Sequence, residues 1–357
     1  MLQNLNKFVQ IAQRIVPKKT TLPILSCVCV EDGFIRATNL ETTIRMPVDD
    51  KRRYALPFGV LKSILKSKPK KLDIDILPKK QVKLSFDGKS LMVKTLDPDD
   101  YPLMPEESFK KLNSWDKATI KALGCMIPFT SKEELKAALK GININLGDDL
   151  TFAATDGHLL RETKIMNGSS EQEQKFKGII PAIPIDIITR YAGSSTEVAY
   201  SKSHIKFTLP SDIEIIIRLI DEKYPPYEEF ARGTKENSVE FSKDEMLSVI
   251  SNAKEFCDKT TYRAILVTSN GSIELSTTDH ERELSFESSL PTDNRKGERK
   301  KTGFNLKYLE KIIKSINSDK IRWEYGNPIE ASYFRGLSEE DEGIPNLLMP
   351  VRLEDKS

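Results

Sequence analysis

The sequence has few of the residues that build disulfide frameworks, metal centres or active sites. It contains only four cysteines and three histidines among 357 residues. The cysteines have neither CxxC spacing nor histidine partners; they are Cys27, Cys29, Cys125 and Cys257. Cys27 and Cys29 alternate along one predicted strand, so they cannot easily bridge each other. The pattern predicts reduced, buried thiols in a cytoplasmic protein and argues against zinc or another metal.

Long apolar runs are also missing. No run approaches the ~20 residues that a membrane-spanning helix requires. Residues 1–16 read as an amphipathic helix, without the apolar stretch and small-residue cleavage site of a secretory signal peptide. Charged residues make up 30% of the chain and hydrophobic residues 38%, which is typical of soluble domains. We expect a cytoplasmic protein with no membrane partner.

Catalytic motifs are absent from the sequence. There is no P-loop, no GxGxxG after a strand, no HExxH and no nucleophile elbow. His158 follows Asp156-Gly157, His280 follows another aspartate, and His204 lies in an exposed-looking strand. Turn-forming residues surround the first two histidines, and the equivalent positions differ between the repeats described next. We therefore predict a binding protein with no catalytic residues and no cofactor.

One strand-turn-strand pattern occurs three times. It reads GFIRATNLETTI, then DLTFAATDGHLLRE, then SIELSTTDHERELSFE. Thr38, Thr155 and Thr278 hold the same position in each copy, at intervals of 117 and 123 residues. An interval this long exceeds any solenoid repeat, so it indicates triplication of a whole domain.

Other markers recur in the same register. Pro57, Pro181 and Asn305 are 124 residues apart, each between an apolar strand and an amphipathic helix. Tyr101-Pro102 recurs 123 residues later as Tyr224-Pro225. The markers predict three consecutive domains, each large enough to bury its own core. Their expected ranges are 1–115, 116–233 and 234–357.

Each predicted domain contains two helices. The first helices are expected at 5–16, 132–140 and 243–254, and the second helices at 59–67, 184–191 and 306–316. Capping boxes at 131–134 and 242–245 mark the start of two of them. In such a box the serine hydroxyl accepts a hydrogen bond from the third amide and the glutamate reaches back to the serine amide.

Basic residues recur on the polar face of four predicted helices. The sets are Lys7 and Arg14; Lys62 and Lys66; Lys132, Lys136 and Lys140; and Lys307, Lys311 and Lys314. On one helix such a face is usually just solvated. Its recurrence favours helices that line a ring and hold duplex phosphates without reading bases. The net charge of only +2 does not exclude this, because acidic residues cluster in predicted loops.

Several motifs, in order along the whole chain, resemble the bacterial sliding clamp, the β subunit of DNA polymerase III. They are TLPIL at 21–25 with TNLE at 38–41, ATDGH at 154–158, GFN at 303–305 with Tyr308, and MPVRL at 349–353. The resemblance implies an α+β fold of three tandem clamp domains, each with two helices packed on antiparallel sheets. It also implies a homodimer, in which two head-to-tail protomers form a six-domain ring with the helices around the hole.

The resemblance further implies a non-catalytic processivity factor for DNA replication. The ring would encircle double-stranded DNA irrespective of sequence and tether the replicative DNA polymerase and other replication and repair proteins. A clamp loader would use ATP to open the ring. Two alternatives stay open on sequence alone: a partner-binding protein that does not tether DNA, and a nucleic-acid enzyme on a triplicated scaffold.

The family's pocket for Gln-x-Leu-x-Phe peptides carries over onto particular residues. They are Leu139, Thr155, Gly157, His158, Leu159, Leu160, Pro225, Phe230, Tyr308, Leu347, Met349, Pro350, Val351, Arg352 and Leu353. Their apolar side chains would form a slot, and Arg352 with backbone groups would anchor the peptide. Without the resemblance, Leu139 and Leu160 would be read as core residues.

The resemblance also places residues at the DNA and at the ring closure. Lys19 matches a basic DNA-contacting position. Phe256 and Cys257 fall near the contact that would close the ring, a heterologous interface between the first and third domains of two copies.

The chain departs from the family at three places. Leu159 replaces an arginine, Glu229-Phe230 replaces part of a basic stretch, and Ala182-Ile183 replaces a basic pair. We expect the first two changes to alter partner preference and the third to weaken one DNA contact.

Overall fold

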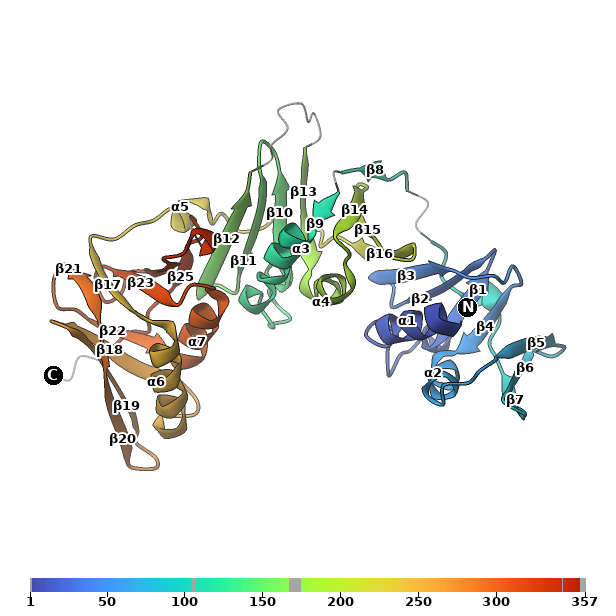
Figure 1. The fold of residues 1–357 in the computed structure, drawn as a ribbon, viewed down its shortest axis with the longest axis horizontal. Coiled ribbons are helices and arrows are strands. Elements are labelled where there is room, and N and C mark those ends of the chain that lie inside the picture. Colours follow the sequence, from blue (N-terminus) through green and yellow to red (C-terminus); the bar gives the residue numbers. More distant parts are fainter. Residues whose placement is uncertain (1, 105–106, 113, 167–174, 342, 354–357) are drawn as a thin grey trace. The chain divides into compact units, whose positions relative to one another are not determined.

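The computed structural model describes residues 2–104, 107–112, 114–166, 175–341 and 343–353. The chain divides into two compact units (Figure 1). Unit 1 comprises residues 1–124 and 180–221, and unit 2 comprises residues 125–179 and 222–357. Each unit combines a nine-stranded sheet, a smaller sheet and short helices, and the described strand pairs are antiparallel. The α+β class predicted from the sequence is confirmed.

The nine-stranded sheet of unit 1 has the order β4-β1-β2-β3-β16-β15-β14-β8, with β9 also on β14. Its strands are β1 (Cys27–Glu31), β2 (Phe34–Thr38), β3 (Thr42–Pro47), β4 (Tyr54–Pro57), β8 (Lys110–Lys111), β9 (Trp115–Asp116), β14 (Ser195–Tyr200), β15 (His204–Leu209) and β16 (Ile213–Arg218). A three-stranded sheet contains β5 (Asp73–Leu77), β6 (Gln81–Phe86) and β7 (Lys89–Lys94). Helix α1 (Leu2–Ala12) lies against α2 (Phe58–Lys66), and α3 (Lys117–Gly124) against α4 (Ala182–Tyr191).

The nine-stranded sheet of unit 2 has the order β13-β10-β11-β12-β25-β24-β23-β17-β21. Its strands are β10 (Gly141–Leu146), β11 (Leu150–Thr155), β12 (Leu159–Ile165), β13 (Phe176–Pro181), β17 (Asn237–Ser242), β21 (Asp293–Lys296), β23 (Lys320–Tyr325), β24 (Ser332–Gly336) and β25 (Asn346–Leu348). The smaller sheet contains β18 (Arg263–Ser269), β19 (Ser272–Asp279), β20 (Leu284–Pro291) and β22 (Lys301–Asn305). The helices are α5 (Glu228–Ala231), α6 (Lys243–Phe256) and α7 (Leu306–Ser315), with α6 against α7.

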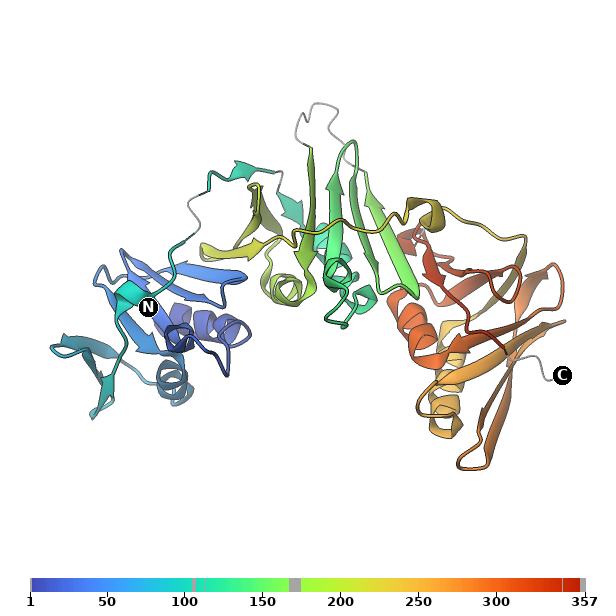
Figure 2. The same ribbon diagram turned by 180° about the vertical axis from the view of Figure 1, so that it is seen from behind.

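Segments far apart in the sequence complete each large sheet. In unit 1, β3 pairs with β16, with Ile44 opposite Ile215. In unit 2, β12 pairs with β25 (Figures 1 and 2), and this pairing places Leu160 opposite Leu347. Ile44, Ile215, Leu160 and Leu347 are all buried, which ties the register of both seams to the apolar core.

The recurring sequence markers occupy equivalent structural positions. Pro57, Pro181 and Asn305 each stand immediately before a helix, at the N-caps of α2, α4 and α7. The strand-turn-strand pattern is also confirmed in all three copies. In each copy the side-chain oxygen of an Asn or Asp accepts hydrogen bonds of 2.7–3.1 Å from the amides two and three residues later, which fixes the turn. The acceptors are Asn39, Asp156 and Asp279. The three domain ranges given above stay a prediction.

One predicted helix is wrong. Residues 131–136 form a loop, followed by a short 3-10 turn at Ala137–Lys140, and the helix of this repeat is α3. The Ser131 amide donates to the Leu139 carbonyl at 2.7 Å and closes the loop. The Ser131 hydroxyl accepts from the Glu133 amide, two residues on, so it forms a serine turn in place of a helix cap. Consequently Lys132, Lys136 and Lys140 do not form a helical stripe.

Local chemistry explains where the helices do begin. The Asp116 carboxylate accepts a 2.8 Å hydrogen bond from the Thr119 amide and caps α3. The serine half of the capping box at 242–245 is confirmed, because the Ser242 hydroxyl accepts from the Glu245 amide at 3.5 Å and caps α6. Helix α1 is shorter than expected and ends at Ala12, in place of residue 16.

A buried arginine joins the β12–β25 seam to helix α7. The Arg161 guanidinium donates 3.0 Å hydrogen bonds to the Ser315 carbonyl, the Ser315 hydroxyl and the Asn346 side-chain oxygen. Only 3% of Arg161 is exposed. Because Ser315 is the last residue of α7, the cation also meets the negative end of the helix dipole.

We predict that Arg161→Met lowers the free energy of unfolding by about 2–4 kcal/mol, because it removes the three hydrogen bonds that the guanidinium donates to partly buried Ser315 and buried Asn346. A urea titration followed by tryptophan fluorescence measures the change. The matched control is Arg299→Met, an exposed arginine of the same unit, which should cost less than about 0.5 kcal/mol. Equal stability of the two variants would contradict the seam's dependence on Arg161.

Candidate functional site

The candidate site is built around the turn between β11 and β12 in unit 2. The Met349 amide donates to the His158 carbonyl at 2.8 Å, directly after the β12–β25 pairing ends. The Val351 amide donates to the Gly303 carbonyl at 2.9 Å. Residues 346–353, the edge segment, are therefore held between this turn and strand β22.

Glycine is required where the edge segment passes β22. A side chain at Gly303 would place its Cβ 2.7 Å from Leu353 and 2.9 Å from the Val351 carbonyl oxygen. Glycine is favoured at position 157 for a different reason: its backbone φ of +94° lies in the left-handed region, which other residues rarely adopt. The tight turn and the close approach together bring the edge segment and the 156–158 turn side by side.

The threonine that begins the turn makes three hydrogen bonds. The Thr155 hydroxyl donates to the Leu159 carbonyl at 2.6 Å and accepts from the Gly157 amide at 3.1 Å. The Thr155 amide donates to the Tyr224 hydroxyl at 3.0 Å. Burial raises the pKa of Tyr224, which stays protonated. Tyr224 therefore fixes the adjacent, exposed Pro225 close to the turn.

Aromatic and basic side chains surround the turn. The His158 ring stacks on Tyr308 of α7, with ring centroids 5.4 Å apart and planes at 19°. The Lys311 ammonium lies 5.3 Å from the centre of the Tyr308 ring. From the loop at 131–136, the Lys136 ammonium reaches to 4.0 Å from the position of a Cβ on Gly157. Partial burial raises the pKa of the Tyr308 phenol.

The residues predicted for the peptide pocket divide into buried and exposed groups. Leu139, Leu159, Leu160 and Leu347 are buried. Pro225, Phe230, Met349 and Arg352 are exposed, and Pro350, Val351, Leu353 and Tyr308 are partly exposed. Apolar side chains thus reach the surface from several segments over a buried leucine layer. Phe230 belongs to α5, which lies against β12 and β25, and its carbonyl accepts a 2.9 Å hydrogen bond from the Tyr333 hydroxyl.

Sequence reasoning missed two members of the site. Tyr224 was identified only as a marker of the repeat, although the recurring Tyr-Pro pair already indicated a fixed structural role. Lys136 was expected on a helix facing DNA, whereas the loop places it beside Gly157. The position of Lys136 depends on the 131–136 loop, which the capping-box pattern wrongly predicts as the start of a helix.

The predicted DNA-facing cations differ in their partners. Arg14 pairs with Asp186, Lys136 with Glu133, Lys140 with Glu134 and Lys314 with Glu310. The Lys7 ammonium donates to the Pro210 carbonyl at 3.1 Å. The Lys307 ammonium lies 3.5 Å from the centre of the Tyr262 ring. Lys19, Lys62, Lys66 and Lys132 are exposed and form no ion pair with the described residues.

The two residues predicted at the ring closure have different environments. Phe256 is 40% exposed and stacks on Phe286, with ring centroids 5.5 Å apart and planes at 8°. Cys257 is buried, and its thiol donates to the Lys254 carbonyl at 3.5 Å. Burial raises the pKa of this thiol. Only Phe256 presents its side chain at the surface.

The histidines lie in three different settings. His158 and His280 are at turns, whereas His204 is largely covered, contrary to the exposed position expected for it. The His204 Nδ1 atom lies 3.2 Å from the Glu107 carboxylate. Hydrogen bonds from Ser201 and Ser203 lower the pKa of Glu107 to about 2. The described residues contain no group of three or more His, Cys, Asp or Glu that could hold a metal ion.

None of the helices among the described residues is both long and apolar enough to span a membrane. No family model matches the chain. Among curated proteins, the beta sliding clamp of Staphylococcus epidermidis is 24% identical over 361 residues, which cover 94% of each chain. The beta sliding clamp of Synechococcus elongatus is 22% identical over 369 residues, covering 98% of this chain and 97% of that one.

Solved structures give the same result for the fold. The DNA polymerase III subunit beta of Pseudomonas aeruginosa superposes with a TM-score of 0.87 at 22% identity, covering 99% of this chain and 98% of that one. The likeness extends over both units and shows the fold. Together with the sequence similarity along nearly the whole length, it makes this chain a divergent relative of the bacterial β sliding clamps.

Proposed function

We propose that this chain is a DNA sliding clamp that encircles duplex DNA and tethers the replicative polymerase and other replication and repair proteins. The observation that carries the proposal is the edge segment, held beside the 156–158 turn with Met349 and Arg352 exposed. An exposed apolar strip with fixed backbone is suited to capture a short peptide. The clamp itself would be non-catalytic and cytoplasmic, and a separate ATP-dependent loader would open the ring.

The peptide would bind along the edge segment. The partly exposed side chains of Pro350, Val351 and Leu353 supply apolar contacts, and Leu160 and Leu347 lie in the layer beneath them. Burying apolar area here contributes about 25 cal/mol per Å². Leu159 is buried opposite Leu348, so it offers no polar contact where the family has an arginine. Lys136 and Lys311 are the basic groups nearest the turn.

We predict that a fluorescent Gln-Leu-Ser-Leu-Phe peptide binds saturably to the chain. Replacing Met349 and Leu160 together by alanine should weaken binding at least about tenfold, because a few buried apolar contacts carry most of the affinity of such sites. Fluorescence anisotropy measures the affinity. Met349→Ala alone tests the same contact without touching the core.

The matched control for the peptide experiment is Met166→Ala with Ile329→Ala. Both residues are exposed apolar side chains of unit 2 outside the site. This control should bind the peptide as the unchanged chain does. Absence of saturable binding by the folded unchanged chain would refute the peptide site as proposed.

DNA would be held through phosphates. Lys62 and Lys66 lie on the solvent face of α2, opposite its buried leucine and isoleucine residues, and form no ion pair with described residues. Lys19 and Lys132 are likewise exposed and form no ion pair with described residues. Contact through such side chains is independent of sequence and depends steeply on salt. The Ala182-Ile183 pair supplies no charge at the start of α4, and Ile183 is 74% exposed.

We predict that binding of unloaded duplex is weak and falls steeply with salt. Lys62→Gln with Lys66→Gln should lower the slope of log affinity against log salt by about 1 for each lysine that touches a phosphate. Lys202→Gln with Lys223→Gln, at two exposed lysines outside the helices, is the control and should leave the slope unchanged.

Topology gives the decisive test of tethering. After loading by the cognate clamp loader, the chain should stay on closed circular DNA during gel filtration and dissociate once the circle is cut. A binding protein or an enzyme that does not encircle DNA would respond equally to both forms, and that result would exclude the ring.

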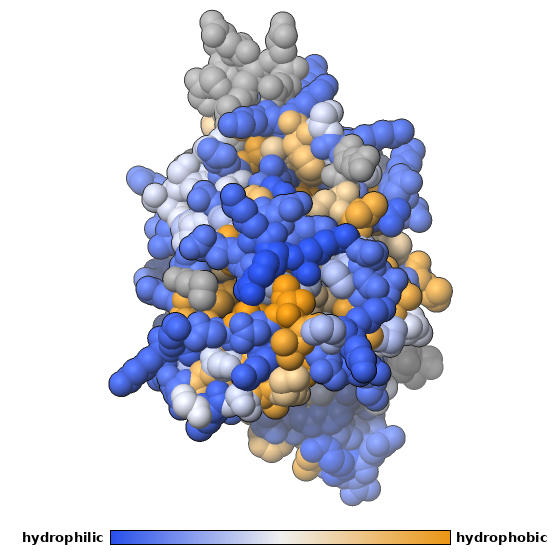
Figure 3. All heavy atoms as spheres, turned by 90° about the vertical axis from the view of Figure 1, so that its right-hand side faces the viewer, coloured by the Kyte–Doolittle hydropathy of each residue, from blue (hydrophilic) through white to orange (hydrophobic). Residues whose placement is uncertain are grey.

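Ring closure would join unit 1 of one copy to unit 2 of another. Among the described residues each unit has a smaller sheet that ends in an edge strand, β7 and β20 respectively. Leu91 and Met92 are exposed on β7, and Phe256, the last residue of α6, stacks on Phe286 of β20. The end of unit 1 that carries β5–β7 shows an apolar patch within a mostly hydrophilic face (Figure 3). Pairing of the two edges would bury both.

We predict that Phe256→Glu gives folded monomers, because it places a charge within this apolar contact. Multi-angle light scattering measures the mass, and circular dichroism verifies the fold. Ile329→Glu, at another exposed apolar position of unit 2, should remain dimeric. A dimer that persists in Phe256→Glu would exclude Phe256 from the interface.

A further inference from the structure

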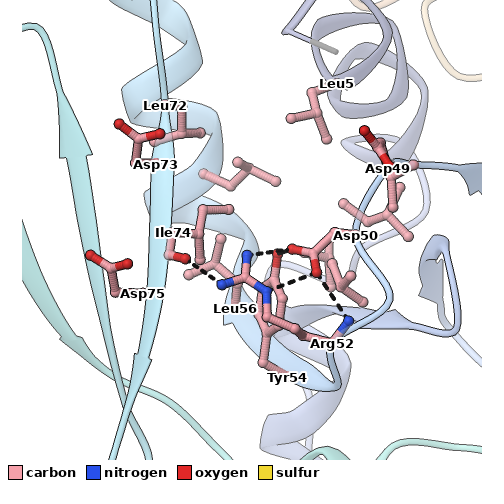
Figure 4. Close-up of a pocket in the computed structure, with 15 residues that line it drawn as sticks. Leu5, Asp49, Asp50, Arg52, Tyr54, Leu56, Leu72, Asp73, Ile74 and Asp75 are labelled. Atoms are coloured by element: carbon pink, nitrogen blue, oxygen red, sulfur yellow. Dashed lines mark hydrogen bonds and ion pairs between the residues drawn. The ribbon is translucent and has the colours of Figure 1, made fainter.

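A partly open cavity of about 270 Å³ is lined by residues of unit 1, none of which belongs to the edge segment. Helices α1 and α2, strands β1, β2 and β4, and strand β5 of the small sheet contribute its walls (Figure 4). Leu5, Val28, Leu56, Leu61 and Leu72 line it, and each is at most 6% exposed. A well-packed core leaves few voids of this size. By comparison, an apolar cavity of about 150 Å³ is enough to bind benzene.

The rim of the cavity is acidic. Four aspartates line it, together with a single basic side chain, Arg52. The aspartates are Asp49, Asp50, Asp73 and Asp75. In Figure 4, Asp73 and Asp75 lie to one side of Arg52 and Asp49 to the other.

The Arg52 guanidinium already forms hydrogen bonds within the chain. Its guanidinium donates to the Asp50 carboxylate at 2.7 and 2.9 Å and to the Ile74 carbonyl at 2.7 Å. The hydrogen bonds from Arg52 lower the pKa of Asp50, which keeps this carboxyl ionised. Asp73 has its own partner, Lys71, at 2.9 Å.

Two aspartates at the rim have no directly bonded partner, although Asp75 lies close enough to Arg52 to help Asp50 raise the pKa of that guanidinium. Asp49 and Asp75 form no ion pair or side-chain hydrogen bond with the described residues. An apolar interior beside two unpaired carboxylates favours a ligand with an apolar body and a positive head, and repels anions. The chain shows that the rim tolerates a cation, because the Arg52 guanidinium lies there 5.7 Å from the centre of the Tyr54 ring.

We propose that this cavity binds a small amphipathic cation, such as an arylalkylammonium. The aryl group enters the cavity between Leu5, Leu61 and Leu72, and the ammonium remains at the rim, where Asp49 and Asp75 make the electrostatic potential negative. Such a ligand touches both sheets of unit 1 and helices α1 and α2 at once. The site is independent of peptide capture and DNA tethering, which involve other residues.

Three probes with the same ring and different charge test the proposal. They are 2-phenylethylammonium, 2-phenylethanol and phenylacetate, titrated into the full chain with labelled leucine, valine and isoleucine methyl groups. We expect the ammonium to shift the methyl signals of Leu5, Val28 and Leu61 in NMR spectra. It should bind about tenfold more tightly than the alcohol, and phenylacetate should bind most weakly.

Two matched double variants isolate the charge. Asp49→Asn with Asp75→Asn should lower the affinity for the ammonium about tenfold and leave the affinity for the alcohol unchanged. Glu339→Gln with Glu340→Gln removes the same net charge from exposed residues of unit 2 and should change neither affinity. Equal affinity for all three probes, or an unchanged ammonium affinity in the aspartate variant, would overturn the charge selection. No methyl shifts at millimolar probe would overturn the site.

Discussion

The pairing of β12 with β25 is the constraint on which the candidate site depends. It aligns Leu160 with Leu347 and Leu159 with Leu348, and all four side chains are buried. A shift of one residue would still place leucine opposite leucine, but it would separate Arg161 from Asn346, whose side-chain oxygen accepts a 3.0 Å hydrogen bond from the guanidinium. The buried leucines and this hydrogen bond together fix the register. Once it is fixed, Met349 can only lie next to His158.

Arg161 extends this constraint to helix α7. It lies opposite Asn346 in the same pairing and holds the final carbonyl of the helix. The N-terminus of α7 is capped by Asn305, which belongs to the same strand, β22, as Gly303. Tyr308 lies in the first turn of the helix. Both ends of one helix are thus tied to the strands that carry the edge segment. The stacking of Tyr308 on His158 results from this double attachment.

The sequence predicts the parts of the fold that local chemistry determines. The turns at Asn39, Asp156 and Asp279 are set by each side chain's own backbone neighbours, so their pattern could be recognised three times over. The expected helix at 132–140 failed because its signals were also local. A serine followed by glutamate suits a serine turn as well as a capping box. Leu135, which a packed helix would bury, is 99% exposed.

Contacts between distant segments could not be read from the residues in the same way. Tyr224 lies 69 residues from Thr155, and nothing in its neighbourhood indicates that its hydroxyl meets that amide. The resemblance to a family predicted most residues of the candidate site. It did not indicate that the expected helix at 132–140, next to that site, is a loop. Tertiary pairing decides which residues meet, and the sequence alone encodes it only through burial patterns that many registers satisfy.

The affinity of a lysine for phosphate likewise depends on the charges beside it, so the net charge of +2 does not predict how strongly the chain binds DNA. The Lys314–Glu310 pair is partly exposed on its lysine side, so it contributes only modestly to stability, and phosphate can replace the carboxylate as the partner of Lys314. The displaced carboxylate then stays close to the phosphate and repels it, which offsets part of the gain. A lysine without a partner, such as Lys62 or Lys66, has no such opposing charge. Equal numbers of lysines on two helices can therefore differ in their hold on DNA, according to the carboxylates beside them.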